Sequence, residues 1–235
     1  MLPQQLRPIL PHGGDRMYRL ISSAVRRAML VIFFVSIGLT ACDAYDPPTI
    51  SLYLATQSGN LDQLERHLHW QADINQPFPD GRYPLHVVAE QGRISLLRAL
   101  LDNDAELDVQ DGNERTPLEQ AILTGHTQVA AHLQQAGAEL QASQLLLIAA
   151  EQGTQDRDVV RYLVAQKADL ETTNLAGETA LLIAIRQKNH RLVAHVLAQG
   201  ADVDVQNAAG HSALQLANEQ QQTDIAQRLR RYGAR

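Results

Sequence analysis

The chain has 235 residues, of which 45% are hydrophobic and 4% aromatic, and its formal net charge at neutral pH is −6. This composition is typical of a folded protein and excludes a disordered chain; the single cysteine also excludes a disulfide-rich scaffold. The acidic balance disfavours nucleic acid as a partner, because such a partner requires Lys and Arg to neutralise its phosphates.

The first 41 residues differ in character from the rest of the chain. Several arginines precede an apolar run over residues 28–39, which leads into Leu39-Thr40-Ala41-Cys42. A basic segment, about a dozen apolar residues and a small-residue cleavage site predict a secretory signal peptide, and the run is short for a membrane span. We therefore assign residues 1–41 to a signal peptide, with Met17 as an alternative start because residues 1–16 are unusual for a basic end.

The residues Leu39-Thr40-Ala41-Cys42 resemble the lipobox of bacterial lipoproteins. This resemblance implies cleavage before Cys42 and lipidation of its thiol, although a lone cysteine after an apolar stretch can instead be a buried bystander. Residues 42–49 would then form a tether, whose seven residues after the cysteine span at most roughly 25 Å. We expect the protein to be anchored at Cys42 and to face the periplasm; Asp43 resembles an inner-membrane retention signal and favours that membrane over the outer one.

From residue 50 onward the chain repeats one pattern six times. The leucines that open the units are Leu52, Leu85, Leu118, Leu146, Leu181 and Leu214, so the steps are 33, 33, 28, 35 and 33 residues. The pattern is clearest in the third unit, with Thr116-Pro117-Leu118 at its first helix, Gly125-His126 at the turn and Gly137-Ala138 after the second helix.

This period and these motifs resemble the ankyrin repeat. The resemblance covers residues 49–235, although the units that begin at Leu52 and Leu146 lack the Thr-Pro pair. It implies an all-α solenoid of six helix-turn-helix units joined by β-hairpin-like loops. The expected units are approximately residues 50–79, 80–110, 111–140, 141–173, 174–206 and 207–235.

The second helix of each unit is expected to carry two pairs of apolar positions, one pair for each neighbouring unit. In the first unit one pair is replaced by Gln63 and His67, and in the last unit the other pair is replaced by Ala226 and Arg230. Terminal repeats need one face that tolerates water, since nothing stacks on it. The sequence therefore predicts six units with a cap at each end.

One junction is irregular. The connection over residues 139–144 leaves the array five residues short of the period and has no turn glycine, and the forward face of the third unit carries only Ala130 and Gln134. Few apolar contacts predict easier local opening between the third and fourth units. Neutral drift in a loop is the alternative to a functional hinge.

No motif for catalysis, a metal or a cofactor occurs in the sequence. The ankyrin resemblance implies structural roles for His86 and His126, and no zinc, paired-cysteine or calcium-loop pattern is present. Ser143 and Ser212 lie near helix starts, where serine usually caps the helix, and neither belongs to a nucleophile elbow. We therefore expect a non-catalytic protein without metal or cofactor, with an enzyme accessory factor or a hidden hydrolase as the less favoured alternative.

The ankyrin resemblance implies that hairpin tips and exposed first-helix positions form a concave surface that binds a protein partner. The implied partner-binding residues are Asp80, Arg82, Tyr83, Glu90, Gln91, Asn113, Glu114, Arg115, Glu151, Gln152, Glu178, Arg186, Gln187 and His211. Most of them are polar or acidic, which indicates a wet interface. After residue 41 the chain has 15 Lys and Arg against 25 Asp and Glu, about −10, which suits either a basic partner or solubility alone.

Four of the seven aromatic residues after residue 41 fall in the first two units, at Tyr53, Trp70, Phe78 and Tyr83. They are either interface anchors or a cover for the end of the stack. The leading hypothesis is a monomeric, membrane-anchored module in the bacterial cell envelope that binds one protein partner. Its sharper form is an immunity or inhibitor protein that neutralises an envelope-acting toxin or enzyme, and the alternative is an assembly scaffold.

Overall fold

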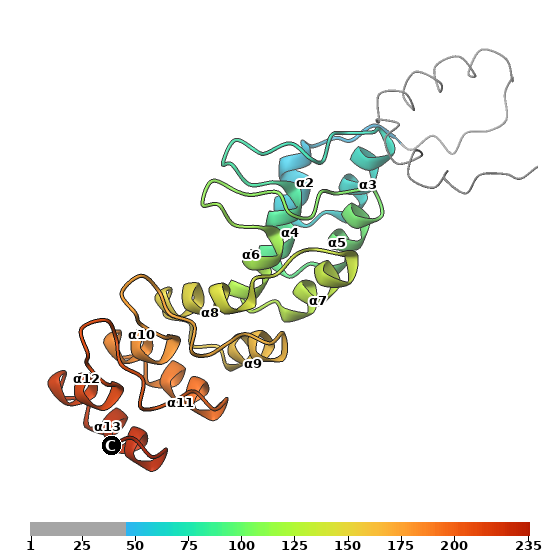
Figure 1. Ribbon diagram of the computed structural model, residues 1–235. Helices are drawn as coiled ribbons and strands as arrows, with labels where there is room; N and C mark the ends of the chain where they lie inside the picture. The colour runs from blue at the N-terminus through green and yellow to red at the C-terminus, as the bar shows by residue number, and fades with distance from the viewer. Residues whose placement is uncertain (1–45) are drawn as a thin grey trace, which may run out of the picture. The chain divides into compact units, whose positions relative to one another are not determined.

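The structure is a computed structural model that describes residues 46–235. The predicted signal peptide and Cys42 lie outside these residues. Within them, twelve helices follow one another in six pairs, without a β-strand and with one isolated bridge between Gln206 and Ser212 (Figure 1). The all-α solenoid of six helix-turn-helix units is thereby confirmed.

Each unit consists of a first and a second helix. The first three units contain α2 (Leu52–Ser58) and α3 (Leu61–His69), α4 (Pro84–Gln91) and α5 (Ile94–Leu101), and α6 (Pro117–Leu123) and α7 (Thr127–Ala136). The last three contain α8 (Ala142–Glu151) and α9 (Arg157–Ala165), α10 (Ala180–Arg186) and α11 (His190–Ala198), and α12 (Ala213–Glu219) and α13 (Thr223–Arg231). Among residues 46–235, no helix has the length and apolarity that crossing a bilayer requires.

Six of the twelve helices in residues 46–235 begin at a residue whose side chain caps the helix. Thr116 Oγ1 accepts a hydrogen bond from the Glu119 backbone N–H at 3.3 Å, while the Glu119 carboxylate accepts one from the Thr116 N–H at 3.0 Å. Ser212 and Gln215 form the same reciprocal pair at the start of α12. Each pair satisfies two N–H groups that lack helical partners, so the start of the helix is fixed locally.

The core is continuous along the stack and consists of leucine, valine, isoleucine and alanine. An alanine in every first helix is fully buried, which lets the helices lie close together. These alanines are Ala55, Ala89, Ala121, Ala149, Ala184 and Ala217. Small side chains at the contacts explain why the chain needs so few aromatic residues in its core.

A hairpin turn, called a finger below, precedes four of the first helices. A backbone hydrogen bond closes each finger. The closing bonds run from Phe78 N to Arg82 O, from Asp111 N to Arg115 O, from Asn174 N to Glu178 O and from Asn207 N to His211 O. These closures confirm the β-hairpin-like loops, but no finger precedes α8.

The boundary between the third and fourth units differs from the others. First helices pack side by side as α2 on α4, α4 on α6, α8 on α10 and α10 on α12, whereas α6 and α8 make little contact (Figure 1). The second helices meet here partly through polar groups: the Tyr162 hydroxyl donates to Gln134 Oε1, and Gln134 Nε2 donates to Gln166 Oε1 at 3.3 Å. The expected weakness of this junction thus has a structural counterpart.

The sequence suggested that the polar face of the first unit is exposed to water. In the structure, the segment before α2 covers this face. Gln63 Oε1 accepts hydrogen bonds from the Thr49 backbone N–H at 2.8 Å and from its hydroxyl at 3.1 Å, and His67 Nε2 lies 2.7 Å from the Ile50 carbonyl oxygen. Gln63 is only 8% exposed. The extended segment 46–51, called the strap below, needs partners for its backbone groups, and these two side chains supply them.

Candidate protein-binding surface

The fingers form two pairs rather than one continuous row. In the first finger pair, residues 78–82 and 111–115, Gly81 lies beside the backbone of Gly112, and an added Cβ would be in ordinary van der Waals contact with its nitrogen, at 3.5 Å. In the second finger pair, residues 174–178 and 207–211, the Ala208 N–H donates to the Ala176 carbonyl oxygen at 3.1 Å. The missing finger before α8 leaves a gap between the two pairs.

Glycine permits the close approach in the second finger pair. Gly177 has φ +70°, a left-handed conformation that side chains disfavour, and a Cβ at this position would lie 2.7 Å from the Ala208 nitrogen. The hydrogen bond between the two fingers therefore depends on the absence of a side chain at Gly177.

A cleft of about 370 Å³ lies where the missing finger would be. The residues that line it are all polar and include four with carboxylates but no Lys or Arg. The lining residues are Asp108, Gln110, Glu114, Thr116, Glu119, Glu139, Gln141 and Gln144. Only Glu114 among them belongs to the partner-binding set expected from the sequence.

A first ion-pair cluster lies in the second unit. Arg82 Nη2 is 2.7 Å from Asp80 Oδ2, and Arg82 Nη1 binds Glu90 Oε2. The hydrogen bond from Arg82 lowers the pKa of the Asp80 carboxyl, and the same bond raises the pKa of Arg82. The structure thus brings together three residues expected at the site and links the finger to the end of α4.

A second cluster spans the fourth and fifth units. Arg186 Nε donates to Glu178 Oε1 at 3.0 Å, and Arg186 Nη2 donates to both carboxylate oxygens of Glu151 at 3.0 and 3.1 Å. Its bond to Glu178 is the main cause that raises the pKa of Arg186. Asn174 Nδ2 also donates to Glu151 Oε1 at 3.1 Å. Asn174 was not among the residues expected at the site, because only the folded finger places it between the two carboxylates.

Two expected contact residues bind the array itself. Gln91 Nε2 donates to the Gln57 carbonyl oxygen at 3.1 Å, and Gln187 Nε2 donates to the Glu151 carbonyl oxygen at 2.8 Å. Each amide thereby satisfies a carbonyl near the end of the preceding first helix. Gln91 and Gln187 position the surface by joining successive units.

His86 joins the second unit to the finger of the third. His86 Nε2 lies 2.7 Å from the Arg115 carbonyl oxygen, and Nδ1 lies 3.4 Å from the Tyr83 backbone nitrogen, so the neutral ring that donates from Nε2 satisfies both partners. Burial lowers the pKa of His86. The Tyr83 ring lies 5.6 Å from this imidazole. The structural role implied for His86 is therefore visible, and it sets the position of Tyr83 and Arg115.

The remaining expected residues, Asn113, Glu114, Gln152 and His211, are exposed. Leu175 projects fully into solvent at the tip of its finger, with an exposed fraction of 108%. The repeat pattern does not reveal how exposed a tip residue is, so Leu175 was not among the expected partner-binding residues. Which of these side chains contact a partner stays a prediction.

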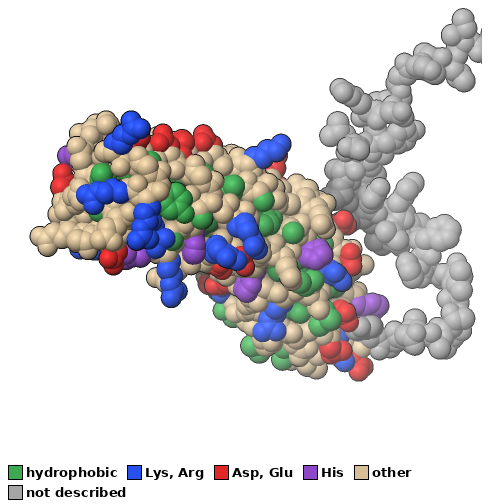
Figure 2. Space-filling view, turned by 90° about the horizontal axis from the view of Figure 1, so that it is seen from below, with side chains coloured by type: hydrophobic (Ala, Val, Ile, Leu, Met, Phe, Trp, Pro, Cys, Tyr) green, Lys and Arg blue, Asp and Glu red, His purple; other side chains and the backbone are tan. Residues whose placement is uncertain are grey.

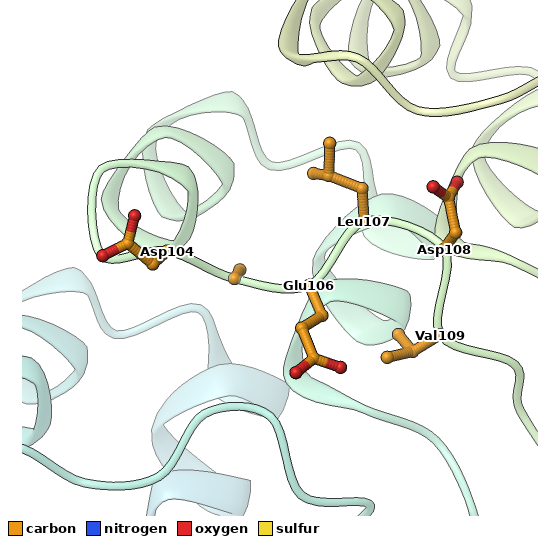
Figure 3. Close-up of a pocket in the computed structure, with 6 residues that line it drawn as sticks. Asp104, Glu106, Leu107, Asp108 and Val109 are labelled. Carbon is orange, nitrogen blue, oxygen red and sulfur yellow. The ribbon is translucent and has the colours of Figure 1, made fainter. Parts of the chain in front are cut away.

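A second hollow, of about 650 Å³, lies along the connection from α5 to the finger at residues 111–115 (Figure 3). Its walls alternate carboxylates with apolar side chains: Asp104, Ala105, Glu106, Leu107, Asp108 and Val109. In residues 46–235 no group of three or more His, Cys, Asp or Glu side chains is arranged to hold a metal ion. Both hollows are lined by carboxylates, which are suited to binding cationic groups.

Comparison with known sequences assigns the family. The pattern of three consecutive ankyrin repeats matches residues 52–144 and again residues 146–235. The chain belongs to the ankyrin-repeat family. Ankyrin repeats are protein-interaction modules, and their fold is typically a non-catalytic scaffold.

Curated ankyrin-repeat relatives are much longer than this chain. A transient receptor potential cation channel subfamily A member 1 homolog from Caenorhabditis elegans is 26% identical over 162 residues, which are 67% of this chain and 13% of the relative. An L-asparaginase from Dirofilaria immitis is 26% identical over 147 residues, 60% of this chain and 25% of the relative. Such matches describe the repeats and leave the activity of the longer proteins aside.

Solved structures share the fold over most of their length. An ankyrin-repeat domain from Acinetobacter baumannii AYE has a TM-score of 0.62 at 24% identity, covering 78% of this chain and 98% of that one. A chain in the complex of a predatory endopeptidase from Bdellovibrio bacteriovorus with an immunity protein has a TM-score of 0.61 at 23% identity, covering 82% and 99%. At these identities the likeness concerns the fold.

Proposed function

We propose that this protein is a non-catalytic module, anchored to a membrane at Cys42 and facing the periplasm, that binds a protein partner through its two finger pairs. The observation that supports the binding role is that side chains at the finger tips are not used in contacts within the array. The side chains of Asn113, Glu114, Leu175 and His211 make no hydrogen bond or ion pair within residues 46–235, while internal contacts hold their backbones in place. Ordered fingers with free tips lower the entropy cost of binding.

The acidic cleft between the finger pairs indicates the chemistry of the partner. Four carboxylates without a basic neighbour in the lining suit a partner that presents Lys or Arg at this point. The proposed anchor and the periplasmic location rest on the lipobox resemblance at Leu39-Thr40-Ala41-Cys42, and Asp43 favours the inner membrane. We expect the protein to act as a monomer.

A second candidate function is that of an immunity or inhibitor protein for an enzyme or toxin that acts in the envelope. It is favoured by the similarity in fold to a chain from the complex of an endopeptidase with an immunity protein. The similarity extends over 99% of that chain. Rescue of cells from a toxin encoded nearby, lost in variants of the finger tips, would support this candidate over a general assembly scaffold.

The binding role is tested by capture from envelope extracts with matched variants. Tyr83→Ala with Arg115→Ala alters the first finger pair, and Leu175→Asp alters the second; Arg98→Ala, on the exposed side of α5, serves as control. We expect the proteins recovered with the unchanged chain and the control to be lost with at least one finger variant. Equal recovery by all four proteins would contradict binding through the fingers.

The anchor is tested separately by labelling cells with a radioactive fatty acid. We expect label in the unchanged protein and none in Cys42→Ser. Absence of label from the unchanged protein would remove the lipoprotein assignment and leave the finger surface untouched.

A further inference from the structure

Charge is distributed unevenly along the array. Residues 46–173 contain 19 Asp and Glu against 8 Lys and Arg, whereas residues 174–235 contain 5 against 7. The first four units are therefore strongly acidic, and the last two carry a small positive excess. At physiological ionic strength fields are screened within about 8 Å, so a surface at the end of the array is governed by its own charges.

The positive excess is concentrated on the last helix and the residues after it. Arg228, Arg230, Arg231 and Arg235 are all exposed, and within residues 46–235 none of their guanidinium groups makes an ion pair or a hydrogen bond. We call these four side chains the α13 arginines. Basic side chains gather at the left of Figure 2, the side on which α12 and α13 lie in Figure 1.

The acidic groups near these arginines do not form ion pairs with them, so most of their positive charge is not neutralised. Asp224 lies one turn before Arg228 on α13 without reaching ion-pair distance, and Asp204 accepts a hydrogen bond from the Arg235 backbone N–H at 3.3 Å. Tyr232 sits among the arginines and is 49% exposed. An aromatic ring with a polar tip beside guanidinium groups is a combination typical of surfaces that meet the headgroup region of a bilayer.

The α13 arginines and the strap both lie on the side of the array that the second helices form. The strap contacts Gln63 and His67 on α3, the second helix of the first unit, and α13 is the second helix of the last. The fingers precede the first helices. A membrane contact by the second-helix row at both ends would leave the finger pairs free for a protein partner.

We infer that the α13 arginines form a second contact with the membrane, binding the phosphate groups of anionic phospholipids. The inference rests on the proposed anchor at Cys42 for its setting. Guanidinium groups bind phosphate oxygens through paired N–H donors. The anchor would hold the array near the bilayer at a high effective concentration, so a patch of modest intrinsic affinity suffices to orient it. An acidic protein is the competing occupant of the same patch.

The test uses residues 45–235, which form one compact unit and contain the core and the strap. Circular dichroism first establishes that each protein is folded. Sedimentation with vesicles of phosphatidylglycerol and phosphatidylcholine, at millimolar lipid, then measures binding, with pure phosphatidylcholine vesicles in parallel. We expect binding to the anionic vesicles alone, and its loss at 0.5 M salt.

The decisive variant is Arg228→Gln with Arg230→Gln and Arg231→Gln. At about fivefold per arginine near a charged surface, the triple variant should bind anionic vesicles roughly 100-fold more weakly. The control carries Arg93→Gln, Arg98→Gln and Arg157→Gln, which remove the same charge from exposed positions elsewhere, and should bind like the unchanged chain.

Two results would overturn the inference. One is the absence of binding to anionic vesicles, whether or not the arginines bind polyglutamate as a stand-in for an acidic protein; the other is equal weakening by both triple variants. Because residues 45–235 lack Cys42, the outcome does not depend on lipidation. Failure of the proposed anchor would appear only in fatty-acid labelling, and failure of the second contact only here.

Discussion

Arg186 donates from Nη2 to Glu151 Oε1 at 3.0 Å, across the boundary between the fifth and fourth units. The same guanidinium holds Glu178, which is only 8% exposed. A single side chain thus satisfies a nearly buried carboxylate and fastens two units together at the proposed binding surface.

Replacing Arg186 with alanine should lower the free energy of unfolding by about 1–2 kcal/mol, because the Glu178 carboxylate loses its charged partner while remaining buried. The half-exposed position of Arg186 keeps the loss below that of a fully buried pair. Arg186→Lys should retain part of the stability, since one ammonium cannot bond both carboxylates as the guanidinium does. Urea unfolding measures both variants.

The control for this comparison is Arg161→Ala, which removes an exposed pair with Asp158 at 3.1 Å. Its effect should stay within about 0.5 kcal/mol. A loss of equal size in the two alanine variants would show that burial of Glu178 is irrelevant.

The stability of the array should depend on pH through His86. Burial places the folded-state pKa below the usual value of about 6.5, so the unfolded chain binds a proton more readily than the folded one. The stabilising contribution is complete above pH of about 6.5 and is lost as the pH falls toward the folded-state pKa. His86→Gln should therefore show a smaller drop in unfolding free energy between pH 7.5 and pH 5 than the unchanged protein.

His190→Gln changes an exposed histidine at the start of α11 and should leave that drop intact. Equal pH dependence of the unchanged protein and His86→Gln would contradict the role given to this imidazole.

Gly177→Ala should separate the second finger pair. Alanine at a positive φ costs about 1 kcal/mol wherever it is placed, and here the new methyl group would also meet the Ala208 backbone. Gly210→Ala is the matched control, since Gly210 has φ +80° and nothing lies within 4 Å of an added Cβ. We expect Gly177→Ala to cost at least about 1 kcal/mol more in unfolding free energy, from the added steric overlap. Equal losses would show that the fingers adjust freely.

Gln63→Ala should release the strap, because Thr49 loses the acceptor for both its N–H and its hydroxyl. The expected loss is about 1 kcal/mol in unfolding free energy, accompanied by faster hydrogen exchange of the Thr49 amide. Gln128→Ala, exposed on α7, should change neither quantity. An unaltered Thr49 exchange rate in Gln63→Ala would mean that the strap is held by other contacts.

Hydrogen exchange should also report the weak boundary between α6 and α8. Amides over residues 134–146 are expected to exchange faster than those at the α4–α6 boundary, since α6 and α8 make little contact with each other. Tyr162→Phe removes the hydroxyl that donates to Gln134 and should accelerate exchange further. Protection equal to that at the α4–α6 boundary would favour neutral drift in the connecting loop over a hinge.

The repeat itself was readable because its leucines and alanines recur at fixed positions. All six alanines and the leucines of the four inner units lie in the core, whereas Leu52 and Leu214 of the terminal units are half-buried against it. The polar positions Gln63 and His67 were also recognisable as departures from the pattern. Their partners were not, since Thr49 and Ile50 contribute backbone groups, and a backbone group looks the same at every position of a sequence.

The sequence predicted which residues lie on the candidate surface, but it did not predict the hydrogen bonds and ion pairs among them. Tip residues follow from their place in the repeat, but the roles of Gln91 and Gln187 as links between units depend on the distance to a carbonyl in the previous helix. The pairing of Arg186 with Glu151 joins residues 35 positions apart, which only the stacking of units brings together.

The little-packed boundary between α6 and α8 has a mechanical consequence. If the chain is held at one end and a bound partner pulls on the other, every boundary bears the same force, and the boundary whose first helices make the least contact parts first. The array should then yield in two steps, first dividing into two blocks of three units and only later unravelling each block. Stretching single molecules in an optical trap would resolve the two events as separate jumps in length.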